Sequence, residues 1–269
     1  MPDLTLGLAA LVFLLTVELA KAARWAALLG PNRPPYSQCV QALVSGQLTN
    51  LLSPVRAGDA IQIGFITVRG GALAPAAATL VGIKLLDACV LLFIASSIFG
   101  VSALGASAAW VVVGAAAACA AAGMAIVGGG GQIQLALLRL PMAERVGIGH
   151  LQDVAFALHS QRVLLLVGLT SGVAWCAGLL ANVAILAAVG IQPTFDLAAR
   201  MLVAGYAVGV LPAPPGRIGV FETAVALALG SAGIAPLTAL AAGVTLHVAQ
   251  FIELALLIVT SVVVRRWFR

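Results

Sequence analysis

Long apolar stretches recur along this chain and constrain its fold more than any other feature. Each is about 20 residues long, which is what an α-helix needs to cross a hydrocarbon core about 30 Å thick. Hydrophobic residues make up 62% of the 269 residues and charged residues only 9%, against about 25% charged in an ordinary soluble domain. We therefore predict an all-α integral membrane protein in which residues 1–269 form a single transmembrane domain.

Some of the apolar stretches are long enough to be complete spans. They are Leu4–Leu29, Ala72–Phe99, Ala103–Val127, Gln161–Gly190 and Pro236–Val264. The first stretch is too long for a signal-peptide core and has no basic leader, so we expect it to be retained as a span.

Two further regions are apolar but interrupted. Ser37–Ser53 is followed by Asp59–Val68, and Phe195–Leu211 by Arg217–Gly230, with proline and glycine between the two limbs of each pair. Each limb is shorter than the roughly 20 residues that a full crossing needs, and proline interrupts a helix. We therefore predict two pairs of half-helices. Each pair forms a re-entrant hairpin that enters and leaves the membrane by the same face.

The distribution of basic residues agrees with two re-entrant hairpins, because cytoplasmic loops collect lysine and arginine. With this topology nearly all loop arginines fall on one side, namely Arg33, Arg69, Arg139, Arg145, Arg162, Arg265, Arg266 and Arg269. The opposite side holds Asp3 and Asp196. We expect the N-terminus outside and the C-terminus in the cytoplasm. The net charge of +5 is then explained by topology and lipid contact, and the sequence has no motif for binding nucleic acid.

The predicted elements form an inverted repeat. Residues 4–99 read span, hairpin, span, and residues 161–264 read in the same order. Residues 103–160 are expected to supply a joining transmembrane helix and a cytoplasmic amphipathic connector, which reverse the second repeat relative to the first. Inverted repeats with interrupted helices at matching positions are typical of transporters whose substrate site lies near the bilayer midplane.

The two interruptions are alike in sequence. Residues 53–59 read S-P-V-R-A-G-D and residues 214–222 read P-P-G-R-I-G-V-F-E, each with proline, arginine, glycine and then a carboxylate. Irregular backbone at membrane depth is tolerated only where protein or a water-filled cavity surrounds it. The helix that follows each interruption starts with N–H groups that favour an anion.

Arginines and carboxylates at the interruptions are candidate substrate-binding residues. Arg56 and Arg217 are suited to gripping a phosphate in bidentate fashion. Asp59 and Glu222 lie in the first turns of the following helices. The alternative is that each arginine pairs with its neighbouring acid and only stabilises the interruption.

Further polar residues are predicted to face the bundle interior, because ionisable groups are costly in lipid. Gln47 and Asn50 on the first limb either bind a headgroup or hydrogen-bond between helices. Lys84 and Asp87 are three residues apart, so they share a helical face and can pair.

Charged residues also lie in the first and last spans. Glu18, Lys21 and Arg24 form a stripe toward the cytoplasmic end of the first span. His247 and Glu253 in the last span suggest a hypothesis of proton coupling, since imidazole titrates near neutral pH. The alternative is that His247 is a hydrogen-bonded structural residue.

Four motifs resemble the transmembrane, flippase-like domain of the lysylphosphatidylglycerol synthase family. They are A-A-R-W at residues 22–25, N-L-L-S-P-V-R-A-G-D at 50–59, I-K-L-L-D at 83–87 and L-P-A-P-P-G-R-I-G-V-F-E at 211–222. The resemblance spans nearly the whole chain. It implies a multi-pass protein of a bacterial inner (plasma) membrane with membrane lipids as cargo, and we expect a stand-alone member without the synthase domain.

The chain departs from the family pattern at several positions. Relatives commonly have Glu-Arg where this chain has Ile83-Lys84, and many have glycine in place of Arg217. A basic residue, often arginine, is common in the region of the last span where this chain has His247. Because of these departures, the resemblance does not identify which lipid is carried.

The sequence predicts a lipid translocator that moves an anionic phospholipid or lipid-linked phosphate by alternating access at a midplane cavity. It leaves open a non-transporting scaffold that holds or regulates a separate lipid synthase or glycosyltransferase, and it leaves open a homo-oligomer. We expect no enzyme activity, because the sequence has no phosphate loop, metal-ligand set or serine-hydrolase motif. For the same reason we expect no cofactor and no metal. The sequence leaves open a lipid-processing enzyme that uses Asp59 or Glu222 in general acid–base chemistry.

Overall fold

The computed structural model describes residues 3–30, 34–53, 57–71, 73–99, 160–209 and 213–267. Some predictions lie outside these residues. They are the joining segment, including the span predicted at Ala103–Val127, the position of Arg56, and the positions of the loop arginines Arg33 and Arg269.

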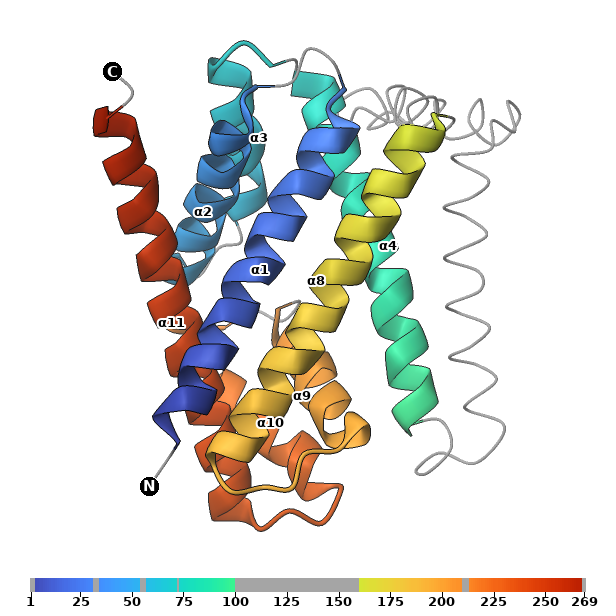
Figure 1. Ribbon diagram of the computed structural model, residues 1–269, viewed down its shortest axis with the longest axis vertical. Helices are drawn as coiled ribbons and strands as arrows, with labels where there is room; N and C mark the ends of the chain where they lie inside the picture. The colour runs from blue at the N-terminus through green and yellow to red at the C-terminus, as the bar shows by residue number, and fades with distance from the viewer. Residues whose placement is uncertain are drawn as a thin grey trace. The chain divides into compact units, whose positions relative to one another are not determined.

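The described part of the chain is helical and contains no strand. Its long helices are α1 (Leu4–Leu28), α4 (Leu73–Phe99), α8 (Gln161–Ala188) and α11 (Pro236–Trp267) (Figure 1). By length and composition, all four are long and apolar enough to cross a membrane. The chain is therefore a multi-pass membrane protein, as predicted.

Short helices occupy the positions of the predicted limbs. They are α2 (Tyr36–Leu52), α3 (Gly58–Val68), α9 (Phe195–Val208) and α10 (Val220–Gly230) (Figure 1). We call the segment between α2 and α3 the first break and the segment between α9 and α10 the second break. The second break contains a 3₁₀ turn, η2, at Pro215–Arg217.

The start of the second limb was predicted too early. Arg217 lies in the 3₁₀ turn, and α10 begins at Val220. The physical reason is the backbone of the second break, where Gly216 and Gly219 have φ values of 73° and 84°. An α-helix excludes positive φ, so it cannot begin until these residues are passed.

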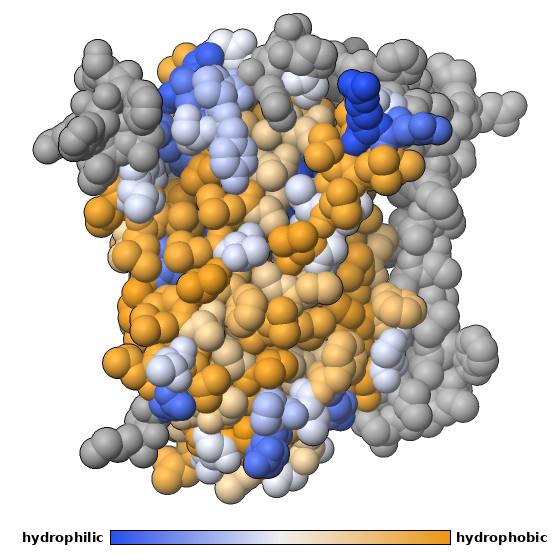
Figure 2. All heavy atoms as spheres, in the orientation of Figure 1, coloured by the Kyte–Doolittle hydropathy of each residue, from blue (hydrophilic) through white to orange (hydrophobic). Residues whose placement is uncertain are grey.

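Apolar side chains lie on the outside of the helices, as expected for contact with lipid. Phe93 of α4, Leu165 of α8 and Leu227 of α10 are all more than half exposed. The face in Figure 2 is dominated by hydrophobic residues. In water such exposure would be unfavourable, so these surfaces support the membrane assignment.

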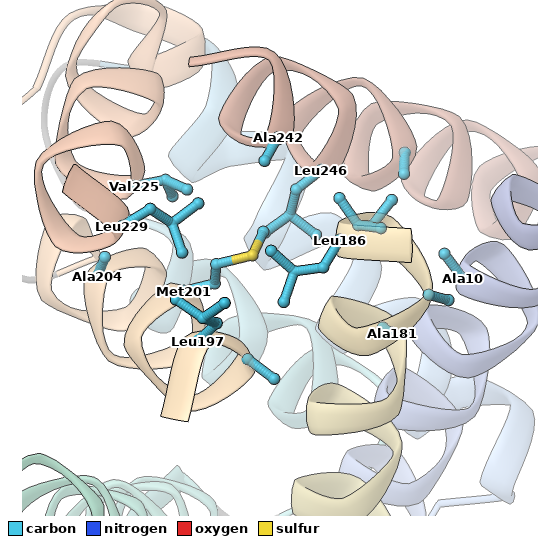
Figure 3. Close-up of a cluster of buried hydrophobic side chains, with 14 of the residues drawn as sticks. Ala10, Ala181, Leu186, Leu197, Met201, Ala204, Val225, Leu229, Ala242 and Leu246 are labelled. Carbon is cyan, nitrogen blue, oxygen red and sulfur yellow. The ribbon is translucent and has the colours of Figure 1, made fainter. Parts of the chain in front are cut away.

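Contacts divide the chain into two compact units, each described here by itself. The first unit comprises residues 1–20, 43–61 and 172–269, and the second comprises residues 21–42 and 62–171. In the first unit, Met201 of α9 is fully buried among Leu186 of α8, Leu229 of α10 and Leu246 of α11 (Figure 3). Small residues from the same helices complete this core, which holds α9 and α10 in place.

The helices α9 and α10 form an antiparallel hairpin within the first unit. Arg200, near the start of α9, donates from Nη1 to Oγ of Ser231, just after the end of α10, at 3.0 Å. At the other end, a Cβ added to Gly205 of α9 would lie 3.3 Å from the ring of Phe221 at the start of α10. The start of α9 and the end of α10 are therefore joined, and the second break lies at the other end of the hairpin.

The first break brings α3 back against α2. The side-chain oxygen of Asn50 accepts the N–H of Gly58 at 2.9 Å. A Cβ on Gly58 would lie 2.2 Å from the backbone oxygen of Gly46, so only glycine fits at this close approach. The last two turns of α2 thus lie directly against the start of α3.

Candidate functional site

Backbone geometry at the second break is unusual. Arg217 has a φ of 55° and is the one non-glycine residue with positive φ in the described ranges. Its N–H donates to the backbone oxygen of Pro214 at 2.8 Å, which closes the turn. A left-handed conformation costs a non-glycine residue about 1 to 2 kcal/mol. A guanidinium is therefore kept at a position where the backbone favours glycine, and such strain is a pointer to function.

Glu222 connects the second break to the last long helix. Its Oε2 accepts the N–H of Gly219 at 2.7 Å, which caps the start of α10. Its Oε1 lies 2.8 Å from Nδ1 of His247 on α11. The close approach of the two helices at Gly243, where a Cβ would lie 3.0 Å from the backbone oxygen of Glu222, makes this contact short.

His247 is enclosed by aromatic rings. Its side chain is 7% exposed. The ring stacks on Phe221 with centroids 4.5 Å apart and contacts Phe251 at 4.7 Å. Sequence reasoning grouped this histidine with Glu253, whereas the structure places it against Glu222. Glu222 and His247 were both predicted as functional residues, and the structure brings their side chains into contact.

At the first break, the predicted amide residues hydrogen-bond within the protein. Asn50 caps α3 through Gly58, as described above. Gln47 donates from Nε2 to Oε2 of Glu18, a buried residue of α1. Asp59 lies in the first turn of α3, as predicted. These contacts follow the alternative that Gln47 and Asn50 bond between neighbouring segments.

The second unit contains a buried ion pair that the sequence did not assign. Arg24 of α1 donates to both carboxylate oxygens of Asp87 of α4, each at 2.7 Å, and also to Oγ of Ser171 at 3.2 Å. The Arg24 side chain is 1% exposed and that of Asp87 is 20% exposed. Lys84, predicted as a partner of Asp87, has an exposed side chain. A bidentate pair of this kind fixes two helices in register.

Arg200 is a further buried polar residue that sequence reasoning missed. It donates from Nε to Oδ2 of Asp196 at 2.7 Å, in addition to its bond with Ser231. The i, i+4 spacing of an acid and an arginine at the start of α9 was the available signal. In the structure it joins the start of α9 to the end of α10.

The predicted site residues fall into both units. Those of the first unit are Gln47, Asn50, Asp59, Arg217, Glu222, His247 and Glu253, and those of the second are Lys84 and Asp87. Among the described residues, no group of three or more histidine, cysteine, aspartate or glutamate side chains is arranged to hold a metal ion. In the first unit, Arg217 stands at a strained turn. Glu222, which follows it closely in the sequence, contacts His247 of α11.

The chain matches one family model over almost its whole length. The model is described as the lysylphosphatidylglycerol synthase TM region, and it matches residues 3–258. The match covers α1 to α10 and most of α11, including the residues on both sides of each break. A comparison with curated proteins finds no match, and a comparison with solved structures finds none either.

Proposed function

The chain belongs to the lysylphosphatidylglycerol synthase transmembrane-region family, and from this premise we propose that it moves an anionic phospholipid or a lipid-linked phosphate between leaflets. Membership implies a membrane protein with a function related to lipids. The step to a translocator rests on the polar, interrupted hairpins, because such irregular backbone requires a hydrated or protein-lined environment at membrane depth.

The observation that carries the proposal is the position of the two breaks. The residues flanking the first break, Asn50 and Gly58, belong to the same compact unit as Arg217 and Glu222 of the second. At each break a polar side chain accepts a backbone N–H where the next helix begins, that of Gly58 in α3 and that of Gly219 just before α10. A shared unit with two such helix starts supports one substrate site rather than two unrelated irregularities.

The proposed architecture is an inverted repeat of two re-entrant hairpins. The order long, short, short, long is the same in α1 to α4 and in α8 to α11. Glu222 and His247 are 25 residues apart, and so are Asp59 and Lys84 at the corresponding places of the first repeat. This equal spacing of an acid and a base supports the repeat. Rocking of one repeat against the other would then open the site to each leaflet in turn.

The proposed substrate site uses the arginines of the breaks. Arg217, and Arg56 at the matching sequence position, would attract the phosphate of a headgroup. The helix starts at Gly58 and Val220 add N–H groups that favour an anion. Acyl chains would stay in the lipid, since the outer surfaces of these helices are apolar.

Leaflet exchange of a labelled lipid tests the proposal. Purified protein is placed in phosphatidylcholine liposomes with a trace of fluorescent phosphatidylglycerol, and a membrane-impermeant reductant quenches the outer leaflet. We expect Arg217→Gln to slow exchange by about 10-fold or more, because a hydrogen bond to a charged group is worth about 1.5 to 3 kcal/mol. Arg69→Gln is the matched control, because it removes a guanidinium after α3, outside both breaks.

Two results would redirect the assignment. If wild-type protein moved no tested lipid and instead stably bound a separate lipid synthase or glycosyltransferase, the scaffold function would be favoured. If it chemically converted the lipid, an enzyme would be favoured.

A further inference from the structure

The contact between Glu222 and His247 has a defined arrangement of protons. Both oxygens of Glu222 act as acceptors, one for the N–H of Gly219 and the other facing Nδ1 of His247. A carboxylate has no proton to donate, so the hydrogen-bond network assigns a proton to Nδ1 of the histidine. A further proton taken up by the pair would then go to Nε2.

Addition of that proton changes the charge of the pair from −1 to zero. Imidazole is the side chain whose charge ordinarily changes between about pH 5 and 8. The carboxylate of Glu222, 2.8 Å away, offsets the charge of a protonated ring. The faces of Phe221 and Phe251, at 4.5 and 4.7 Å, also favour a cation. A carboxylate and two aromatic rings therefore lie in contact with the ring of His247.

Other charged groups on the neighbouring elements are few. Helices α9 and α11 pack against α10, and α1 and α8 add side chains to the same buried core. Helix α1 carries the buried Glu18, which accepts a hydrogen bond from Gln47. On α9 the charged residues are Asp196 and Arg200, which bond to each other at the end of the hairpin away from the second break. On α11, Glu253 is the charged residue near His247 in sequence, and Arg265 and Arg266 follow near the end of the helix. The second break contributes Arg217.

We propose that the Glu222–His247 pair is a proton-binding site whose occupancy is coupled to the binding of a phosphate-bearing headgroup at the second break. The inference rests on the proposed function, in which Arg217 receives the headgroup. The pair lies against the second break, because Glu222 accepts the N–H of Gly219 and a Cβ on Gly216 would lie 3.7 Å from the ring of Phe251, which contacts His247. When the pair carries a charge of −1, it therefore repels an anion at the break. When the pair is neutral, that opposition is removed, so proton uptake strengthens anion binding. By linkage, anion binding strengthens proton uptake by the same factor.

The first repeat has a lysine where the second has this histidine. Lys84 follows Asp59 at the spacing at which His247 follows Glu222. A lysine ordinarily keeps its charge through the range in which imidazole changes. The coupling is therefore assigned to the second repeat.

The test measures binding of a short-chain, soluble phosphatidylglycerol to protein in phosphatidylcholine nanodiscs at pH 5.5 and pH 8.0. The phosphodiester of this probe keeps its charge over that range, so any change with pH belongs to the protein. We expect binding to be about 5- to 150-fold tighter at pH 5.5, the usual range for coupled ligands. Glycerophosphoglycerol, the soluble phosphodiester headgroup without acyl chains, and short-chain phosphatidylcholine, tested in parallel, distinguish a free headgroup and a zwitterionic lipid from the anionic lipid.

Two variants shift the charge of the pair in opposite directions. His247→Gln holds the pair at −1, so binding should stay weak at both pH values. Glu222→Gln removes the negative charge while keeping the shape of the cap, so binding at pH 8.0 should approach the wild-type value at pH 5.5. A purely structural role would instead weaken binding in both variants.

The outcomes separate this inference from the proposed function. Equal binding at both pH values by protein that still exchanges phosphatidylglycerol between leaflets would overturn the proton coupling and leave translocation standing. Weaker binding in both variants would also overturn it. Absence of binding at either pH, together with absence of exchange, would overturn the coupling and the proposed function together.

Discussion

The two breaks share a sequence plan but are closed by different chemistry. At the first break a neutral amide, Asn50, caps the start of α3 through Gly58. At the second break a carboxylate, Glu222, caps the start of α10 and also contacts a histidine. The same arrangement of proline, arginine, glycine and acid thus yields one break with a neutral cap and one with a charged, titratable cap. We therefore expect the second break, rather than the first, to respond to pH.

The largest expected difference between the two breaks is in the stability lost when a glycine is replaced by alanine. Gly58→Ala would place a Cβ 2.2 Å from the backbone oxygen of Gly46, and neither backbone can move away easily. We expect it to lower the free energy of unfolding by about 3 kcal/mol. Gly219→Ala meets no atom within 4 Å but must adopt a φ of 84°, which costs about 1 to 2 kcal/mol. Denaturant titration of the purified protein in detergent measures both changes.

The control for this comparison is Gly64→Ala in the middle of α3. This glycine has open space around it and no positive φ, so alanine should stabilise the helix by about 1 kcal/mol. If Gly58→Ala were as harmless as Gly64→Ala, the tight contact between α2 and α3 would be wrong.

A smaller difference is expected between the two caps. Glu222→Ala removes a hydrogen bond to a charged group and leaves His247 without its carboxylate, which should lower the free energy of unfolding by about 2 to 3 kcal/mol. Asn50→Ala removes a neutral hydrogen bond and should cost about 1 kcal/mol. The measurement is the same denaturant titration, repeated at pH 5.5 and pH 8.0.

The pH dependence distinguishes the two caps further. If the Glu222–His247 pair binds a proton as we propose, the cost of Glu222→Ala should differ between the two pH values. The cost of Asn50→Ala should not. An equal pH response in both variants would mean that the caps are chemically equivalent and that the difference between the breaks has no consequence.

The smallest expected effect on stability is at Arg217. Arg217→Gly relieves the positive φ of 55° and should raise the free energy of unfolding by about 1 kcal/mol, while leaflet exchange is lost. A gain in stability with a loss of activity is the expected sign of strain retained for function. Unchanged exchange in a more stable variant would show that the guanidinium has no role in transport.

Much of the fold could be predicted from the sequence, because hydropathy and helix-breaking residues act locally. The bounds of α1, α4 and α8 lie within a residue or two of the predicted spans. The start of α10 was missed, because the turn around Gly216 uses left-handed conformations that a hydrophobicity pattern does not encode. Local sequence patterns therefore predict the long helices. They do not predict the left-handed turn after which α10 begins.

Partners of the charged residues could not be predicted in the same way. Lys84 and Asp87 were predicted to be able to pair, and the structure adds a partner on another helix, because both oxygens of Asp87 bond to Arg24. His247 was grouped with Glu253 on its own helix, whereas its contact is with Glu222. Which charges meet depends on which helices pack and at what height, and spacing within one helix carries no information about either.

The measurement that tests the central claim most directly is the rate of leaflet exchange of labelled phosphatidylglycerol in liposomes that contain the purified wild-type protein. A lipid translocator should raise that rate well above the rate in protein-free liposomes. The increase should disappear when Arg217 is replaced by glutamine and persist when Arg69 is. A rate equal to that of protein-free liposomes, with folded protein present in the membrane, would contradict the assignment.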